Sequence, residues 1–117
     1  MIRKRNGGDR CYEQYSFYPS ANNHTPIGQF DIDIYDGYIY ILNLCIYEPY
    51  RNKGFGTQMV KELVDRFSCT TKPLELDVHT YNEAAIRVYT KAGFIISEDK
   101  SYYKNAHKMT YIRKEKN

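Results

Sequence analysis

The stretch "YIYILNLCIYEPYRNKGFGTQMVKELVDRF" (residues 38–67) changes from an apolar run to a helical pattern through a loop that contains Gly54 and Gly56. The apolar run before the loop indicates a buried strand. After Gly54 the apolar residues fall at positions 55, 59, 60, 63, 64 and 67, on one side of a helix that is expected to end near Ser68. We therefore predict a strand, a loop and an amphipathic helix in direct succession.

The loop before this helix has the chemistry of an anion site. The first N–H groups of a helix have no partner inside it, and glycines let a phosphate approach the backbone closely. Arg51 and Lys53 add positive charge nearby. The order of residues does not match a Walker-type loop, and Met59 stands where a dinucleotide fingerprint needs its third glycine. An ordinary strand-to-helix turn would account for the two glycines equally well.

A β-hairpin is predicted upstream, in "FDIDIYDGYIYIL" (residues 30–42), because Asp36-Gly37 is a preferred pair for a two-residue turn. This turn places Ile34 opposite Ile39 and Ile32 opposite Ile41, so that these residues and Phe30 share one core face. The second strand is also apolar on its other face, which carries Leu42, Leu44 and Ile46. We therefore expect a central strand that is covered on both sides.

The rest of the chain supplies further strands and one more helix. Residues 73–79 alternate between apolar and polar side chains and predict a strand. The next helix is expected to begin after an N-cap at Asn82 and to end at Gly93. Strands are also expected at 11–18, 94–98 and 108–114, with a loop at 19–26 and a loose arm at 1–10. The order predicts an α/β layered (α+β) domain with a mixed sheet, built from residues 11–117.

Length and composition limit the class of protein. A chain of 117 residues is expected to form one domain. Its net charge of +3 is concentrated at the two ends, so a nucleic-acid-binding function is the weakest of the readings. Three cysteines without a CxxC pair, and no apolar run of membrane-spanning length, predict a cytoplasmic protein without a structural metal.

Two segments resemble the GNAT superfamily of N-acetyltransferases that use acetyl-coenzyme A (acetyl-CoA). In "LCIYEPYRNKGFGTQMV" (44–60), Arg51, Gly54 and Gly56 match the family's cofactor pattern. "LDVHTYNEAAIRVYTKAGF" (76–94) resembles its later segment, with an asparagine, a tyrosine and a final Gly-Phe. The resemblance covers roughly residues 28–112. It implies a compact GNAT-like fold with a central, mixed, twisted sheet flanked by helices and a shortened N-terminal part.

The resemblance also implies a role for individual residues. The backbone of a bulged strand would pair with the pantetheine arm of acetyl-CoA, and the loop amides would hold its pyrophosphate. Asn82 would contact the cofactor where two central strands separate, and Tyr89 would lie near the thioester sulfur. The implied cofactor-binding residues are Leu44, Cys45, Ile46, Arg51, Asn52, Lys53, Gly54, Phe55, Gly56, Thr57, Asn82 and Tyr89.

Tyr89 and Asp77 are the candidate catalytic residues. A phenol stays protonated at neutral pH and can give its proton to a departing thiolate, although a helical tyrosine can also be a simple core residue. The acceptor amine needs a base, because a lysine-like ammonium costs about 4.6 kcal/mol to deprotonate at pH 7. Asp77 lies five residues before Asn82, where some relatives carry a glutamate; a water bridge is favoured for it over direct transfer. A solvated surface carboxylate is an equal alternative, and Glu48 and Glu75 are competing bases.

Taken together, the sequence predicts an N-acetyltransferase that moves an acetyl group from acetyl-CoA to a primary amine by direct attack, with no metal. Few residues precede the hairpin, and none reads as a helix, so the acceptor groove should be open. An open groove favours a lysine or N-terminus of a protein, or a homodimer in which a neighbouring subunit closes it. The alternative is an inactive acyl-CoA-binding or protein-interaction module on the same fold.

Overall fold

The computed structural model describes residues 1–5, 11–67 and 71–112, which form one seven-stranded sheet and two α-helices. The strands lie in the order β1-β2-β3-β4-β5-β7-β6. Only β4 and β5 are parallel, and every other neighbouring pair is antiparallel, so the predicted mixed sheet is confirmed. The strands are β1 (Ile2–Lys4), β2 (Tyr12–Phe17), β3 (Gly28–Ile34), β4 (Ile39–Ile46), β5 (Leu74–His79), β6 (Ile95–Ile96) and β7 (Ala106–Tyr111).

The β3–β4 hairpin has the register that its turn predicts. Ile34 pairs with Ile39 and Ile32 with Ile41. The Tyr35 N–H donates a hydrogen bond to the Tyr38 carbonyl at 2.9 Å and closes the turn. Ile32, Ile39 and Ile41 are buried, so the predicted core face of the hairpin is confirmed.

A bulge in β4 overturns the prediction for its second half. Gln29 pairs with Cys45 and Asp31 pairs with Leu42, so one residue of β3, Phe30, lies opposite two residues of β4, Asn43 and Leu44. The extra residue reverses the alternation. Leu44 and Ile46 therefore pack against the core. They had been expected to lie on the same face as Leu42, and that expectation is wrong.

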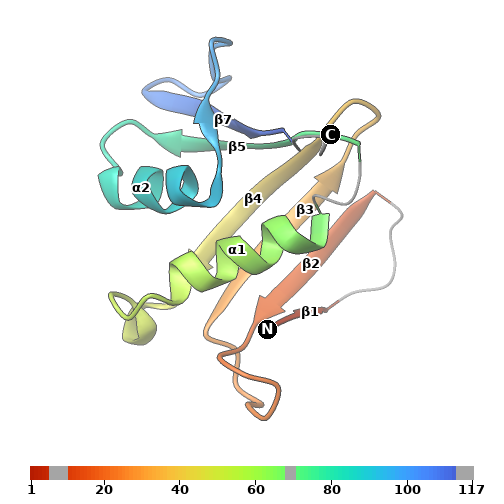
Figure 1. The fold of residues 1–117 in the computed structure, drawn as a ribbon, viewed down its shortest axis with the longest axis vertical. Coiled ribbons are helices and arrows are strands. Elements are labelled where there is room, and N and C mark those ends of the chain that lie inside the picture. Colours follow the sequence, from red (N-terminus) through yellow and green to blue (C-terminus); the bar gives the residue numbers. More distant parts are fainter. Residues whose placement is uncertain (6–10, 68–70, 113–117) are drawn as a thin grey trace, which may run out of the picture.

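Both helices lie over the same face of the sheet (Figure 1). Helix α1 spans Phe55–Phe67 and buries Met59, Val60, Leu63, Val64 and Phe67, as its apolar pattern predicts. Helix α2 spans Glu83–Ala92; Asn82 caps its first turn, and Gly93 ends it at φ 107°. Within the described residues no helix covers the opposite face of β4, contrary to the expectation of a strand covered on both sides. None of the described helices is long and apolar enough to span a membrane.

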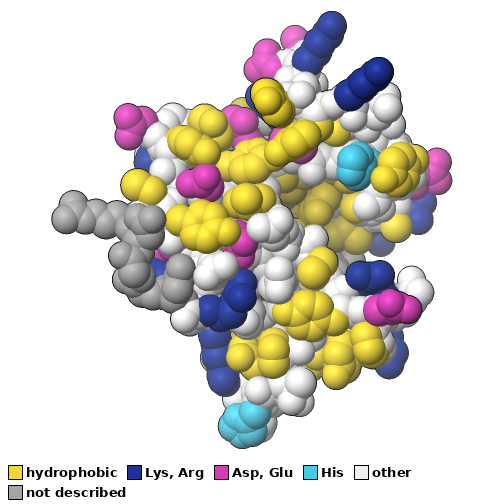
Figure 2. Space-filling model, turned by 180° about the vertical axis from the view of Figure 1, so that it is seen from behind, with side chains coloured by type: hydrophobic (Ala, Val, Ile, Leu, Met, Phe, Trp, Pro, Cys, Tyr) yellow, Lys and Arg dark blue, Asp and Glu magenta, His cyan; other side chains and the backbone are white. Residues whose placement is uncertain are grey.

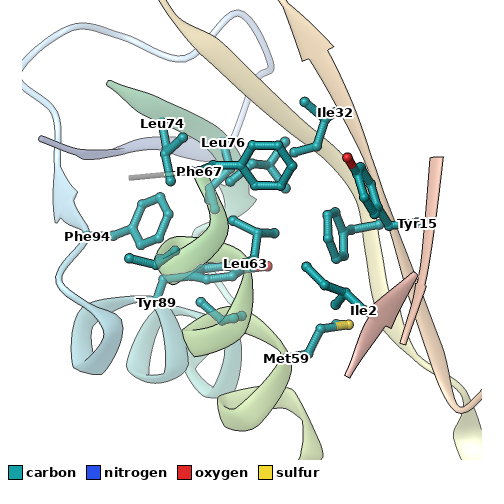
Figure 3. Close-up of a cluster of buried hydrophobic side chains, with 14 of the residues drawn as sticks. Ile2, Tyr15, Ile32, Met59, Leu63, Phe67, Leu74, Leu76, Tyr89 and Phe94 are labelled. Atoms are coloured by element: carbon teal, nitrogen blue, oxygen red, sulfur yellow. The ribbon is translucent and has the colours of Figure 1, made fainter. Parts of the chain in front are cut away.

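The core lies between α1, α2 and this face of the sheet (Figure 3). Side chains from both ends of the chain meet α1 there. Phe67 of α1 packs edge-on against the Tyr15 ring, with ring centroids 5.6 Å apart. The ring centroids of Tyr89 of α2 and Phe94 are 5.9 Å apart. One continuous core therefore fixes α1 and α2 relative to the sheet.

The two ends of the chain depart from the predicted elements. Residues 1–10 were expected to be a loose arm, but Ile2–Lys4 pair with β2 as strand β1, and Ile2 is buried. Residues 6–10 lie outside the described part of the chain. The final two strands are confirmed, although β6 is shorter than expected and β7 begins earlier, at Ala106.

Candidate active site

The sheet opens between its two parallel strands. β4 and β5 are paired only at Ile39–Leu74 and Tyr40–Glu75. Beyond these pairs β4 continues along β3 and β5 continues along β7, and the two strands diverge (Figure 1). Among the described strands, none pairs with this side of β4 after the bulge. Its peptide groups are therefore available to a ligand that carries amides of its own.

A cavity of about 560 Å³ lies beside this opening. It extends from the end of β4, past the loop before α1, to α2. Its lining contains ten of the residues expected to bind the cofactor, but Lys53 and Phe55 are absent from it. The lining residues are Leu44, Cys45, Ile46, Tyr50, Arg51, Asn52, Gly54, Gly56, Thr57, Val60, Asn82, Ala84, Ala85, Val88 and Tyr89.

Five of these lining residues were missed by sequence reasoning: Tyr50, Val60, Ala84, Ala85 and Val88. Val60 had been assigned to the core, and it is in fact buried. The three α2 residues lie within about one and a half turns before Tyr89, so the helical period around that tyrosine could have identified them.

The loop before α1 turns through two residues with positive φ, Asn52 at 63° and Gly54 at 84°. The first helical hydrogen bond runs from the Gln58 N–H to the Gly54 carbonyl, at 3.2 Å. The N–H groups of residues 55–57 therefore precede the helical hydrogen-bond pattern. No acidic side chain lies in the first turn of α1. This end of α1 is suited to an anion.

The glycines and the arginine of this loop differ in what they do. A Cβ on Gly54 would meet nothing within 4 Å, so its positive φ is what requires glycine. A Cβ on Gly56 would lie 3.9 Å from Ile46 Cγ1, an ordinary contact, so the protein's own packing does not require glycine there. Arg51 Nε donates to the Ile46 carbonyl at 2.8 Å and ties the loop to the end of β4.

Tyr89 is buried at the cavity wall, and burial raises the pKa of its phenol to about 12. The phenol is therefore protonated throughout the neutral range. Burial also raises the pKa of the Cys45 thiol, which does not favour a cysteine nucleophile. Asn82 lies at the same cavity, and its Oδ1 accepts a hydrogen bond from the Ala85 N–H at 3.2 Å.

Asp77 does not lie in this cavity. Leu76 and Val78 of β5 point into the core, so Asp77 lies on the face that the helices leave uncovered. Its Oδ2 accepts a hydrogen bond from the Tyr40 hydroxyl and its Oδ1 accepts one from the Ser101 hydroxyl, each at 2.5 Å. The structure therefore places the two candidate catalytic residues on opposite sides of the sheet.

A second cavity of about 560 Å³ surrounds Asp77. Figure 2 shows this side of the molecule, where hydrophobic side chains, tyrosines included, gather over the sheet. The lining residues are Tyr35, Tyr38, Tyr40, Glu75, Asp77, Lys100, Tyr102, Tyr103 and Lys108. This cavity combines aromatic rings with two carboxylates and two ammonium groups.

The competing candidates have other surroundings. Glu48 is exposed in the single 3₁₀ turn η1 (Glu48–Tyr50) and lines neither of these two cavities. Glu75 forms an ion pair with Lys108 at 3.8 Å. His79 stacks on Tyr81, with ring centroids 5.1 Å apart. The described residues contain no group of three or more His, Cys, Asp or Glu that could hold a metal ion.

Comparison with known proteins agrees with this geometry. The model of the Acetyltransferase (GNAT) family matches residues 5–94. An N-alpha-acetyltransferase 50 from Danio rerio is 39% identical over 69 residues, which cover 56% of this chain. The match spans only 41% of that relative's length.

Solved structures share the fold at low sequence identity. A GNAT family acetyltransferase from Elizabethkingia anophelis with acetyl-CoA bound has a TM-score of 0.74 at 18% identity, with 96% of this chain and 97% of that chain covered. A spermidine N-acetyltransferase from Vibrio cholerae in complex with CoA and spermine also reaches 0.74, at 16% identity, covering 91% of this chain and 68% of that one.

Proposed function

This chain belongs to the GNAT family of acetyltransferases, and we propose on that basis that it transfers the acetyl group of acetyl-CoA to a primary amine. The observation that carries the proposal is the opening between β4 and β5. It brings the unpaired side of β4 and the start of α1 to one cavity. An extended, amide-bearing arm that ends in a diphosphate needs this pair of features.

The lining of the cavity offers partners for the pantetheine arm and for the diphosphate of acetyl-CoA. The peptide groups of Leu44, Cys45 and Ile46 would pair with the amides of the pantetheine arm. The amides of residues 52–57 would hold the pyrophosphate, with the charge of Arg51 nearby. The open space at Gly56 supports this assignment, because its missing Cβ leaves room on the cavity side that the protein itself does not fill. Asn82 would contact the arm at the far wall.

Direct attack of the amine accounts for the chemistry with residues of this chain. The amine nitrogen forms a bond to the thioester carbonyl carbon, the carbon–sulfur bond breaks, and the thiolate takes a proton. Tyr89 is proposed as the donor, since it is buried at the cavity wall and protonated at neutral pH. Burial makes the phenol a weaker acid than a free tyrosine, and it also makes the departing thiolate a stronger base, because burial disfavours both anions.

The amine is proposed to approach from the uncovered face, through the second cavity. Asp77 remains the proposed base there, since it lines that cavity next to the opening. Both of its oxygens already accept hydrogen bonds, so the proton would reach it through the Tyr40 hydroxyl or a water molecule. In the first case Tyr40 gives its own proton to Asp77 as it receives that of the amine.

A protein N-terminus or an exposed lysine is the proposed acceptor. The second cavity is open, and no described helix walls it, which suits an amine on a macromolecule. The curated relative is named an N-alpha-acetyltransferase, whereas one structural relative is named a spermidine N-acetyltransferase. A cytoplasmic location is part of the proposal; it is supported by the free thiols of Cys11 and Cys45.

Thiol release from acetyl-CoA tests the proposal, with peptides of varied N-terminus, lysine peptides and spermidine as acceptors. Release that depends on a peptide amine is expected. Saturable binding of acetyl-CoA without release by any of these amines would favour the alternative of an inactive binding module. An absence of acetyl-CoA binding would refute both.

A further inference from the structure

The bulged residue of β4 is hydrogen-bonded to a side chain of the neighbouring strand β3. Asn43, the bulged residue, has a φ of 55°, a conformation that asparagine tolerates better than most residues. Its Nδ2 donates a hydrogen bond of 2.8 Å to Asp31 Oδ2 on β3. The pair joins the two strands at the point where their register shifts.

Asp31 is itself fixed from two further directions. Although it lies on the face without helices, only 3% of its surface is exposed. Tyr12 of β2 donates to its Oδ2 at 2.5 Å, and Arg5 Nη2 donates to its Oδ1 at 3.2 Å. A buried carboxylate is strongly destabilising unless it is paired and hydrogen-bonded. Arg5 of the N-terminal segment and Tyr12 of β2 therefore stabilise the buried carboxylate of Asp31 beside the bulge.

The bulge decides which way β4 presents its second half. Without the extra residue the strand would shift by one position, and Leu44 and Ile46 would turn to the uncovered face. In the bulged register, β3 and the second half of β4 approach each other closely at Gly28. A Cβ on Gly28 would lie 2.7 Å from the Cys45 carbonyl oxygen and 2.9 Å from Ile46 Cδ1.

We propose that Asp31 is a positioning residue for acetyl-CoA, acting through Asn43. By holding the bulge it keeps residues 44–46 at the cavity and prevents their return to the unbulged register. Asp31 is not a catalytic residue, because it lines neither of the two cavities. This inference rests on the proposed function, because residues 44–46 are the part of β4 that is proposed to pair with acetyl-CoA.

Three variants isolate the Asp31–Asn43 hydrogen bond. Asn43→Gly keeps the positive φ at no steric cost but removes the donor. Asn43→Asp keeps the shape and turns the donor into a second carboxylate. The double variant Asp31→Asn with Asn43→Asp exchanges donor and acceptor and should restore the bond, with the Tyr12 hydroxyl now accepting from the new amide at position 31. Tyr47→Phe is the matched control, because it removes another side-chain hydrogen bond to β3, from Tyr47, the residue after β4, to Gln29 at 2.9 Å.

CoA affinity is measured by calorimetry and the KM for acetyl-CoA by thiol release. Asn43→Gly should raise both Kd and KM about tenfold with kcat little changed, since a hydrogen bond to a charged group is lost. Asn43→Asp should weaken binding further, and the exchanged double variant should recover most of the affinity. Tyr47→Phe should bind as the wild type does. Wild-type affinity in Asn43→Gly, with only a lower melting temperature, would overturn the proposal.

Amide hydrogen exchange of the ligand-free protein tests the role of the Asp31–Asn43 hydrogen bond independently of the reaction. The amides of residues 44–46 should exchange faster in Asn43→Gly than in Tyr47→Phe; equal rates in the two variants would overturn that role. Failure of the wild type to bind CoA would refute the proposed function, and the exchange rates would still decide whether the hydrogen bond holds the bulge. If Asn43→Gly does not fold, Asp31→Asn is used in its place, and unchanged affinity and exchange would again overturn the proposal.

Discussion

The hydroxyl of Tyr40, which belongs to the last residue pair that joins β4 and β5, donates a hydrogen bond of 2.5 Å to Asp77 Oδ2. Ser101 donates to the other oxygen, so the carboxylate links both strands to the connection between β6 and β7. Burial first, and then the hydrogen bond and charge of Asp77, raise the pKa of Tyr40 well above its ordinary value. The Tyr40 phenol is therefore a hydrogen-bond donor to Asp77 at any physiological pH.

Substitution of Asp77 separates a base from a structural link. Asp77→Asn keeps the shape but removes the proton acceptor, so kcat should fall by about 100-fold or more if Asp77 is the base. The KM for acetyl-CoA should be unchanged, because Asp77 lies outside the cofactor cavity. Steady-state thiol release with a peptide acceptor measures both constants.

Ser101→Ala is the control for this experiment. It removes the other hydrogen bond of the carboxylate without removing the proton acceptor, and its cost in stability should be about 1 kcal/mol. If Asp77→Asn and Ser101→Ala lower the melting temperature alike and leave kcat unchanged, Asp77 is a link between elements. The base would then have to be sought at Glu75, Glu48 or a water molecule.

The two loop glycines should respond differently to alanine. Gly56 is in α1, and its Cβ would meet only an ordinary contact, so Gly56→Ala should stabilise the ligand-free protein by about 0.5 kcal/mol. The same methyl group would project toward the diphosphate and weaken acetyl-CoA binding. Thermal melts with and without acetyl-CoA measure both effects. Tighter binding in Gly56→Ala would contradict the proposed place of the diphosphate.

Gly54→Ala should destabilise even the ligand-free protein. Gly54 has a φ of 84°, which an alanine adopts at a cost of about 1 kcal/mol, and no neighbouring atom adds a clash. Opposite shifts of the melting temperature in Gly54→Ala and Gly56→Ala would therefore separate backbone strain from loss of ligand space. A lower melting temperature in both would mean that Gly56 is also required by the protein itself.

Local patterns predicted the elements of this fold well, because each depends on neighbours in sequence. Asp36-Gly37 set the hairpin register, and Asn82 and Gly93 ended α2 where expected. The bulge at Asn43 was implied only by family resemblance, since alternation alone placed Leu44 on the wrong face. The hydrogen bond from Asn43 to Asp31 at this bulge joins two strands and forms only in the folded sheet.

The site was predicted in part for the same reason. The loop residues 51–57 are continuous in sequence, and most of them line one cavity. Asp31 was not identified from the sequence, because the partners that bury it, Arg5 and Tyr12, come from elsewhere in the chain. The attachment of Asp77 to Ser101 spans 24 positions and has no sequence signal.

Gly28 should be intolerant of any side chain. It pairs with Ile46, and its Cβ would lie 2.7 Å from a backbone carbonyl that cannot rotate away. Gly28→Ala should cost about 2 kcal/mol or more of unfolding free energy, measured by urea denaturation. Because the clash is with Cys45, acetyl-CoA binding should weaken as well. Unchanged stability would mean that the second half of β4 moves more freely than its register implies.

Tyr89→Phe should change both the reaction and the alkaline stability. Loss of the phenol should lower kcat by about 100-fold if Tyr89 protonates the thiolate, with little change in acetyl-CoA affinity. In the wild type the unfolded chain releases this proton near pH 10, whereas the folded protein keeps it until about pH 12. The unfolded state thus binds fewer protons in that interval, and the free energy of unfolding falls as pH rises.

The Tyr89 contribution to that fall is about 3 kcal/mol between pH 10 and pH 12, and Tyr89→Phe should lack it. Other tyrosines also ionise there, so the measured quantity is the difference between wild type and variant in urea denaturation at each pH. Below pH 9 the difference should be constant, because Tyr89 is protonated in both states. Parallel pH profiles combined with unchanged kcat would show that Tyr89 is neither deeply buried nor the acid, since each property predicts its own change.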